Sequence, residues 1–114
     1  MQEITSITDN SKQRMSLTLE DNQGSVDFYL YYLPTQYSWY YDFTYKNYTS
    51  NGNKVVLNPN ALRHLRKLLP FGLMFSGEGN IEPFQQSDFA SGRIKMYVLS
   101  ADDVQLIESE VYGV

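Results

Sequence analysis

The chain has 114 residues with a formal net charge of −4, and 42% of its residues are hydrophobic against 19% charged. This length and composition predict one globular domain, residues 1–114, and the negative charge argues against sequence-independent nucleic-acid binding. Because the chain has no Cys and one His, it contains no disulfide framework or thiolate metal site, and a His-based site would need carboxylate ligands. We therefore expect no metal or other cofactor.

The N-terminal residues lack the basic and apolar regions of a signal peptide. The longest apolar run, residues 68–75, is interrupted by Pro70 and Gly72 and is far shorter than the roughly 20 residues of a membrane helix. We therefore expect no membrane partner, and a soluble protein that works in the cytoplasm or in an assembly built there.

Apolar residues that alternate with polar ones predict strands over the first half of the chain. Residues 2–7 form a weak first strand, and Met15, Leu17 and Leu19 mark a second. A turn at residues 21–24 leads into an aromatic strand at 26–33, and a second aromatic strand follows at 37–45. Wide aromatic rings pack well on a pleated surface, so these two strands are expected to form the centre of the fold.

The next segment carries a turn signal and a helix signal. Asn51-Gly52 predicts a tight hairpin turn with a short return strand at 54–57. Asn58-Pro59 is typical of a helix start, and leucines at helical spacing predict an amphipathic helix over about 59–69. The opposite arc of this helix is basic and contains Arg63, Arg66 and Lys67.

The last third combines strands, a long loop and a helix. Strands are predicted at 71–75 and 93–99, separated by a polar, turn-rich loop over 76–92. Phe84 and Phe89 in this loop either pack onto the domain or become ordered against a partner. Ser100 to Asp103 resembles a capping box, which predicts a short C-terminal helix over about 101–111.

Together these elements predict a mainly β fold with a minor α+β character. We expect a small antiparallel β-sandwich or barrel that carries the short amphipathic helix at 59–69 and the C-terminal helix at 101–111. The pattern does not separate the sandwich from the barrel.

Catalytic chemistry is not indicated. His64 is on the polar side of the predicted helix, without a Ser, Cys or carboxylate placed near it in the sequence, and Asp102-Asp103 is typical of an acidic first helical turn. We predict no catalytic residues and no enzyme. The basic arc and the acidic segment 102–110 are each either a solvated face or a docking surface, and such opposite patches would suit packing in an assembly.

Several motifs resemble those of a known family. They are L-x-L at Leu17 and Leu19, F-Y-L-Y-Y at 28–32, W-Y-Y-D-F at 39–43, Asn51-Gly52 and the leucine-containing segment 62–69. In this order they resemble the small baseplate plug proteins of contractile-tailed bacteriophages, of the kind described in a cyanophage baseplate. The resemblance covers most of residues 16–69. It implies a non-enzymatic component of the virion tail, present in several copies near the centre of the baseplate. The implied partners are tube and hub or spike proteins, with wedge proteins as further candidates.

In such an assembly the exposed aromatic and basic side chains are the candidate contacts: Tyr29, Tyr31, Tyr40, Arg63, Arg66, Lys67, Phe84 and Phe89. If a second sheet covers the strand faces that carry the tyrosines, those tyrosines are core instead. The alternative function is a carbohydrate-binding module that stacks sugars on Trp39 and Tyr41 beside Asp42, although Trp39 is also a good candidate for the core.

Overall fold

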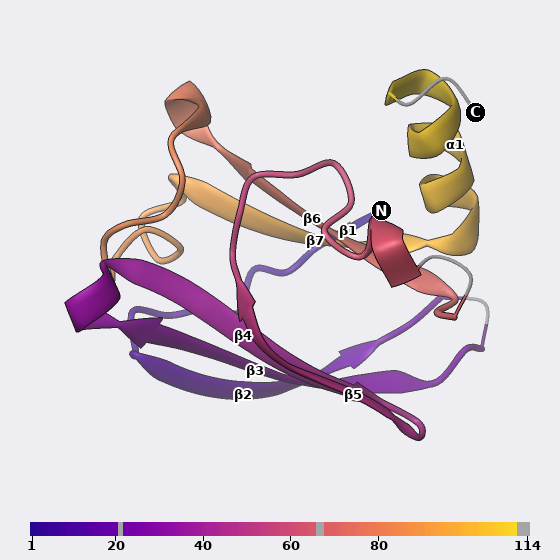
Figure 1. The fold of residues 1–114 in the computed structure, drawn as a ribbon, viewed down its shortest axis with the longest axis horizontal. Helices are drawn as coiled ribbons and strands as arrows, with labels where there is room; N and C mark the ends of the chain where they lie inside the picture. The colour runs from indigo at the N-terminus through magenta and orange to yellow at the C-terminus, as the bar shows by residue number, and fades with distance from the viewer. Residues whose placement is uncertain (21, 66–67, 112–114) are drawn as a thin grey trace.

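The computed structural model describes residues 1–20, 22–65 and 68–111, and they form two antiparallel sheets packed face to face (Figure 1). The four-stranded sheet has the order β2 (Lys12–Thr18), β3 (Ser25–Leu33), β4 (Ser38–Tyr45) and β5 (Tyr48–Lys54). The three-stranded sheet has the order β1 (Gln2–Glu3), β7 (Ile94–Ser100) and β6 (Phe71–Gly77). The fold is therefore a sandwich and not a closed barrel, which confirms the mainly β prediction and decides between its two forms.

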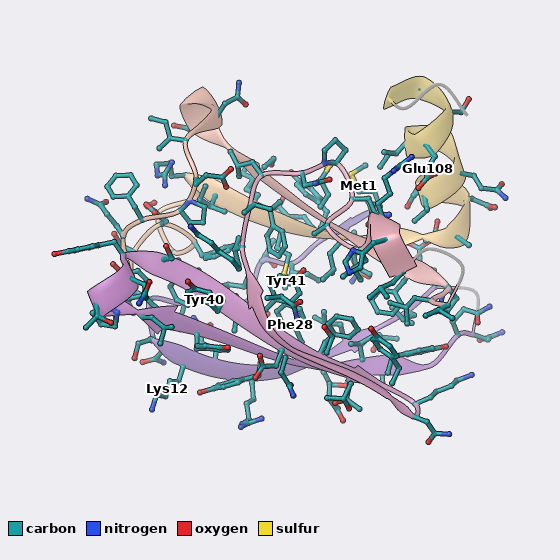
Figure 2. The ribbon with its side chains drawn as sticks, in the orientation of Figure 1. Met1, Lys12, Phe28, Tyr40, Tyr41 and Glu108 are labelled. Atoms are coloured by element: carbon teal, nitrogen blue, oxygen red, sulfur yellow. The ribbon has the colours of Figure 1, made fainter. Side chains whose placement is uncertain are left out.

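The core lies between the sheets because alternate residues of each strand point inward. Phe28 and Tyr41 from the four-stranded sheet are 2% and 3% exposed, and both lie between the sheets in Figure 2. The ring of Tyr41 is tilted against that of Phe75 from β6, with centroids 5.6 Å apart. Burial also raises the pKa of Tyr41 to about 12, so its hydroxyl is neutral across the physiological range. Aromatic rings from both sheets therefore form the contact that holds the layers together.

The hairpin between β4 and β5 differs from the predicted one. Its turn is at Lys46-Asn47, where Lys46 has a φ of +53°, and Tyr45 pairs with Tyr48 on either side. Asn51 and Gly52 instead lie inside β5, where the register with β4 shifts between Tyr41 and Phe43. The predicted turn at Asn51-Gly52 is therefore wrong, because the positive φ that Gly allows is used here for a β-bulge.

The amphipathic helix predicted over 59–69 is also wrong in the described part of the chain. Only a short 3₁₀ turn, Arg63–Leu65, forms there. The backbone N–H groups of Asn58 and Ala61 donate instead to the carbonyls of Phe75 and Leu73 on the outer edge of β6. These bonds cover an otherwise open sheet edge, so a tertiary contact overrides the leucine spacing.

The C-terminal helix is confirmed as α1 (Ala101–Val111), directly after β7. Its start is a reciprocal capping box, in which Asp103 N–H donates to Ser100 Oγ and Ser100 N–H donates to Asp103 Oδ2. Short 3₁₀ turns also occur at Pro34–Gln36 and Glu78–Asn80. Within the described ranges, no helix is long and apolar enough to cross a membrane.

Candidate interaction surface

Three tyrosines gather on the outer face of the four-stranded sheet, away from the core. β3 supplies Tyr29 and Tyr31, and β4 supplies Tyr40 directly opposite Tyr31 in the register. The rings of Tyr29 and Tyr31 are stacked with centroids 5.0 Å apart, and those of Tyr31 and Tyr40 with centroids 6.0 Å apart. All three are half-buried, and among the described residues no second sheet lies over them. We call Tyr29, Tyr31 and Tyr40 the tyrosine face.

Polar contacts fix the position of these rings. The Tyr31 hydroxyl donates to Asp42 Oδ1 at 3.1 Å, and the same carboxylate oxygen accepts the Gly52 N–H of the β-bulge at 2.7 Å. The guanidinium carbon of Arg14, on β2, lies 4.2 Å from the centroid of the Tyr29 ring. Desolvation, and then the hydrogen bond to Asp42, raise the pKa of Tyr31. The tyrosine face is therefore ordered before any partner arrives, which lowers the entropy lost on binding.

An open hollow of about 650 Å³ adjoins the tyrosine face, because small side chains follow the rings along the strands. Its wall includes Arg14, Asp27, Tyr29, Asp42 and Asn51. The hollow thus offers one guanidinium, two carboxylates and an amide beside an aromatic surface. Of these groups, Tyr and Arg are enriched at protein–protein interfaces, whereas Asp is depleted.

The aromatic row proposed for sugar binding does not exist on the surface. Trp39 is 0% and Tyr41 is 3% exposed, since both belong to the core. The aromatic side chains that do reach this surface are those of the tyrosine face, where the ring of Tyr31 is stacked against the rings of Tyr29 and Tyr40.

The other sequence-predicted contacts are scattered. Arg63 is on the 3₁₀ turn Arg63–Leu65, with its Nε 3.6 Å from Glu108 Oε1 of α1, and Arg66 and Lys67 lie outside the described residues. One member of the basic arc and one of the acidic segment therefore meet within the same chain, which is not the arrangement of separate patches that the sequence suggested.

The two loop phenylalanines have different environments. Phe84 is 43% exposed, whereas Phe89 is 7% exposed and its ring packs edge-on against Trp39 at 5.3 Å. Phe89 is therefore a core residue, and its inclusion among the contacts is corrected. His64 is exposed on the same 3₁₀ turn as Arg63.

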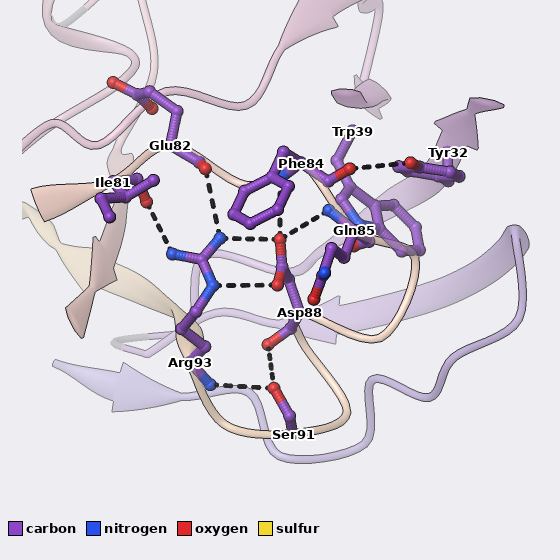
Figure 3. Close-up of polar contacts among 9 residues, drawn as sticks. All are labelled: Tyr32, Trp39, Ile81, Glu82, Phe84, Gln85, Asp88, Ser91 and Arg93. Carbon is purple, nitrogen blue, oxygen red and sulfur yellow. Dashed lines mark hydrogen bonds and ion pairs between the residues drawn. The ribbon is translucent and has the colours of Figure 1, made fainter. Parts of the chain in front are cut away.

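A buried ion pair organises the long loop before β7 (Figure 3). The Asp88 side chain is 1% exposed, and Arg93 donates to both of its carboxylate oxygens, from Nε at 2.9 Å and from Nη2 at 2.7 Å. Arg93 also donates to the carbonyls of Ile81 and Glu82, and Asp88 accepts the N–H groups of Phe84 and Gln85. We call the Asp88–Arg93 pair with these backbone contacts the loop clamp.

The loop clamp also joins the loop to the four-stranded sheet. Trp39 Nε1 donates to the Gln85 carbonyl at 2.9 Å, and the Tyr32 hydroxyl donates to the Phe84 carbonyl at 2.8 Å. The loop of residues 76–92 is therefore built into the domain at one end of the sandwich. The sequence pattern did not indicate this pair, because a carboxylate and a guanidinium five residues apart in a turn-rich segment have no periodic signature.

We expect the loop clamp to make stability fall in acid. Burial acts to raise the pKa of Asp88, but the hydrogen bonds from Arg93, Gln85 and Phe84 outweigh it and lower that pKa below its usual value of 3.8. A carboxyl whose pKa is lower in the folded state contributes stability above the unfolded pKa, and this contribution disappears as the pH falls through the folded pKa. Urea unfolding of the wild type and Asp88→Asn between pH 7 and pH 2 should show the difference in stability shrinking below about pH 4. A constant difference over that range would contradict this assignment.

Comparison with known proteins assigns the chain to a family. No match was found among curated proteins. The family model described as cyanophage baseplate Pam3 plug gp18 matches residues 1–102, which include both sheets, the tyrosine face and the loop clamp. This match also confirms the resemblance read from the motifs of residues 16–69 and extends it to most of the chain. The chain belongs to the family of cyanophage baseplate plug proteins.

Proposed function

We propose that the chain is a structural component of a contractile phage tail, packed in several copies near the central tube and hub of the baseplate as a plug or adaptor. Family membership supports the structural baseplate role and contact with other baseplate components. The family is one of structural plugs and not of enzymes. The position near the tube and hub, the copy number and assembly in the host cytoplasm are the parts we propose.

The tyrosine face is the observation that carries the proposed contact. It presents large rings whose orientation is already fixed by Arg14, Asp42 and neighbouring rings. Tyr and Arg are enriched among the residues that dominate binding energy, especially when they are held rigid. We propose that a tube or hub protein covers this face in the assembled baseplate, with Phe84 as a second contact at the end of the sandwich.

Immunogold labelling locates the chain in the particle. Antibody raised against the recombinant chain is applied to source particles, both intact and with the tails opened, because a central component is masked in intact tails. We expect label at the distal end of opened tails. Absence of label there, with the protein free in the lysate, would overturn the proposed function.

Replacing two rings tests the tyrosine face. In the double variant Tyr31→Ala and Tyr40→Ala, we expect the amount of chain per purified tail to fall at least about tenfold in competition with wild type, since two such anchors typically contribute more than 1.4 kcal/mol together. Quantitative mass spectrometry of the tails measures this ratio. The matched control is Tyr97→Ala, because Tyr97 is half-buried on β7 of the other sheet. Equal incorporation of the double variant and the control would exclude the tyrosine face as the contact.

A further inference from the structure

The edges of the two sheets differ in whether their backbone groups are already paired. The outer edge of β6 is covered by Asn58 and Ala61, whose N–H groups donate to Phe75 and Leu73. β5 carries the bulge at Asn51 and Gly52, and β1 has only two residues. These three edges are thus covered, distorted or very short, which are the ways in which proteins protect sheet edges.

β2 is a regular edge strand of seven residues with an open side. In its pairing with β3, Tyr32 N–H donates to the Ser11 carbonyl and Leu19 N–H donates to the Gly24 carbonyl, at the two ends of one continuous register. Bonded and non-bonded pairs alternate along an antiparallel ladder. The backbone N–H and C=O groups of odd-numbered β2 residues therefore bond to β3, and those of even-numbered residues point away from β3, toward the open edge. The outward residues are Lys12, Arg14, Ser16 and Thr18.

No group in the described part of the chain bonds to the backbone of these four outward residues. All four side chains are exposed on the outer sheet face, next to the tyrosine face, and Figure 2 shows Lys12 on that side of β2. The strand therefore offers four unpaired N–H groups and four unpaired carbonyls along one regular edge. Such a row binds an extended peptide by backbone hydrogen bonds.

The side chains along this edge define the partner's chemistry. Lys12 and Arg14 form the start of the row, and neither has a carboxylate partner among the described residues. Side chains directly opposite each other on neighbouring strands interact, and opposite charges there are favourable. On the inner side Met15 is only half-buried and would be covered by an apolar residue of an added strand.

We propose that β2 pairs with an extended strand of a neighbouring baseplate protein, which places carboxylates beside Lys12 and Arg14 and apolar residues over Met15. The inference rests on the proposed function for the source of that strand. A second copy of this chain is a poorer occupant. In the antiparallel register that pairs all four outward residues, Arg14 lies opposite Ser16 of the other copy, and the two Arg14 side chains become diagonal neighbours of like charge.

Amide hydrogen exchange in purified tails and in the free chain tests strand pairing directly. In the free chain we expect the amides of the four outward residues to exchange fast and those of Gln13, Met15 and Leu17 to exchange slowly. In tails that contain the chain, we expect the four outward amides to become as slow as the other three. If the chain is present in the tails and these amides still exchange fast, the strand-pairing inference fails while the proposed function stands. If the chain is absent from the tails, both the proposed function and the strand-pairing inference are contradicted.

A backbone variant separates strand pairing from simple coverage. Ser16→Pro removes one outward N–H and leaves the ladder with β3 intact, and Pro is tolerated on edge strands. Its matched control, Ser16→Val, keeps the N–H and favours a strand. We expect at least about tenfold less incorporation of Ser16→Pro than of Ser16→Val, at similar melting temperatures. Equal incorporation would overturn the proposal, and if Ser16→Pro does not fold, the exchange measurement on the wild type decides.

The charge of the partner strand has its own test. Lys12→Glu is expected to reduce incorporation several-fold, because it places like charges across the new pair. Lys95→Glu is the control, since Lys95 is exposed on β7 of the other sheet. Incorporation of Lys12→Glu at the level of this control would exclude an acidic partner strand.

Discussion

Arg93→Ala is expected to lower the free energy of unfolding by roughly 3–5 kcal/mol, the range seen when one partner of a buried ion pair is removed. The physical reason is that Asp88, with a side chain only 1% exposed, would keep its charge without the two hydrogen bonds from Arg93. The carbonyls of Ile81 and Glu82 would lose their donor in the same variant. Urea unfolding at pH 7, followed by far-UV circular dichroism, measures the change.

Two further variants make this expectation specific to the loop clamp. Lys95→Ala removes an exposed cation two residues away and should change stability by no more than about 0.5 kcal/mol. Arg93→Lys keeps the charge but not the bidentate geometry, so its free energy of unfolding should lie between those of the wild type and Arg93→Ala. A loss below about 1 kcal/mol for Arg93→Ala would show that the pair does not organise the loop.

Trp39→Ala is expected to destabilise the chain by about 3–5 kcal/mol, as large-to-small substitutions of buried aromatic residues do. Trp39 is 0% exposed, contacts Phe89 edge-on, and donates its indole N–H to the Gln85 carbonyl. The substitution therefore leaves a cavity and also an unpaired carbonyl at the end of the loop. Because Trp39 is the one tryptophan of the chain, the variant has no tryptophan fluorescence, and circular dichroism follows its unfolding.

Tyr37→Ala is the matched control for this core substitution. Tyr37 is also aromatic and lies two residues away, but it is 71% exposed. Its replacement should change the free energy of unfolding by no more than about 0.5 kcal/mol. Similar losses for the two variants would contradict the placement of Trp39 at the centre of the core.

The aromatic strands could be predicted from the sequence because alternation is a local property. Every second residue of 26–33 and of 37–45 is large and apolar or aromatic, and the structure buries those side chains except that of Tyr37, which is 71% exposed just before β4. The outward position of Tyr29, Tyr31 and Tyr40 could be predicted from the same alternation, because the residues between the inward-facing ones point to the opposite side of each strand. The capping box before α1 was equally local, with its two partners three residues apart.

The errors arose where a local signal has two physical uses. Asn51-Gly52 suits any backbone with positive φ, and here it forms a bulge whose Gly52 N–H is held by Asp42. The segment 58–69 has leucines at helical spacing, but the N–H groups of Asn58 and Ala61 bond to the open edge of β6. The loop clamp needs the whole fold, because its Trp39 and Tyr32 contacts come from residues about fifty positions earlier in the chain.

The covered edge of β6 limits how many strand-pairing neighbours one molecule can have. A sheet protein with two open edges can join copies end to end without limit, as in fibres, whereas one open edge permits a single such contact. Because Asn58 and Ala61 cover β6, a bulge distorts β5 and β1 has only two residues, addition of a strand at β2 uses the last regular edge of the described chain and leaves none for the next molecule. A subunit of this kind stops growth in that direction, so it would finish an assembly and not extend it.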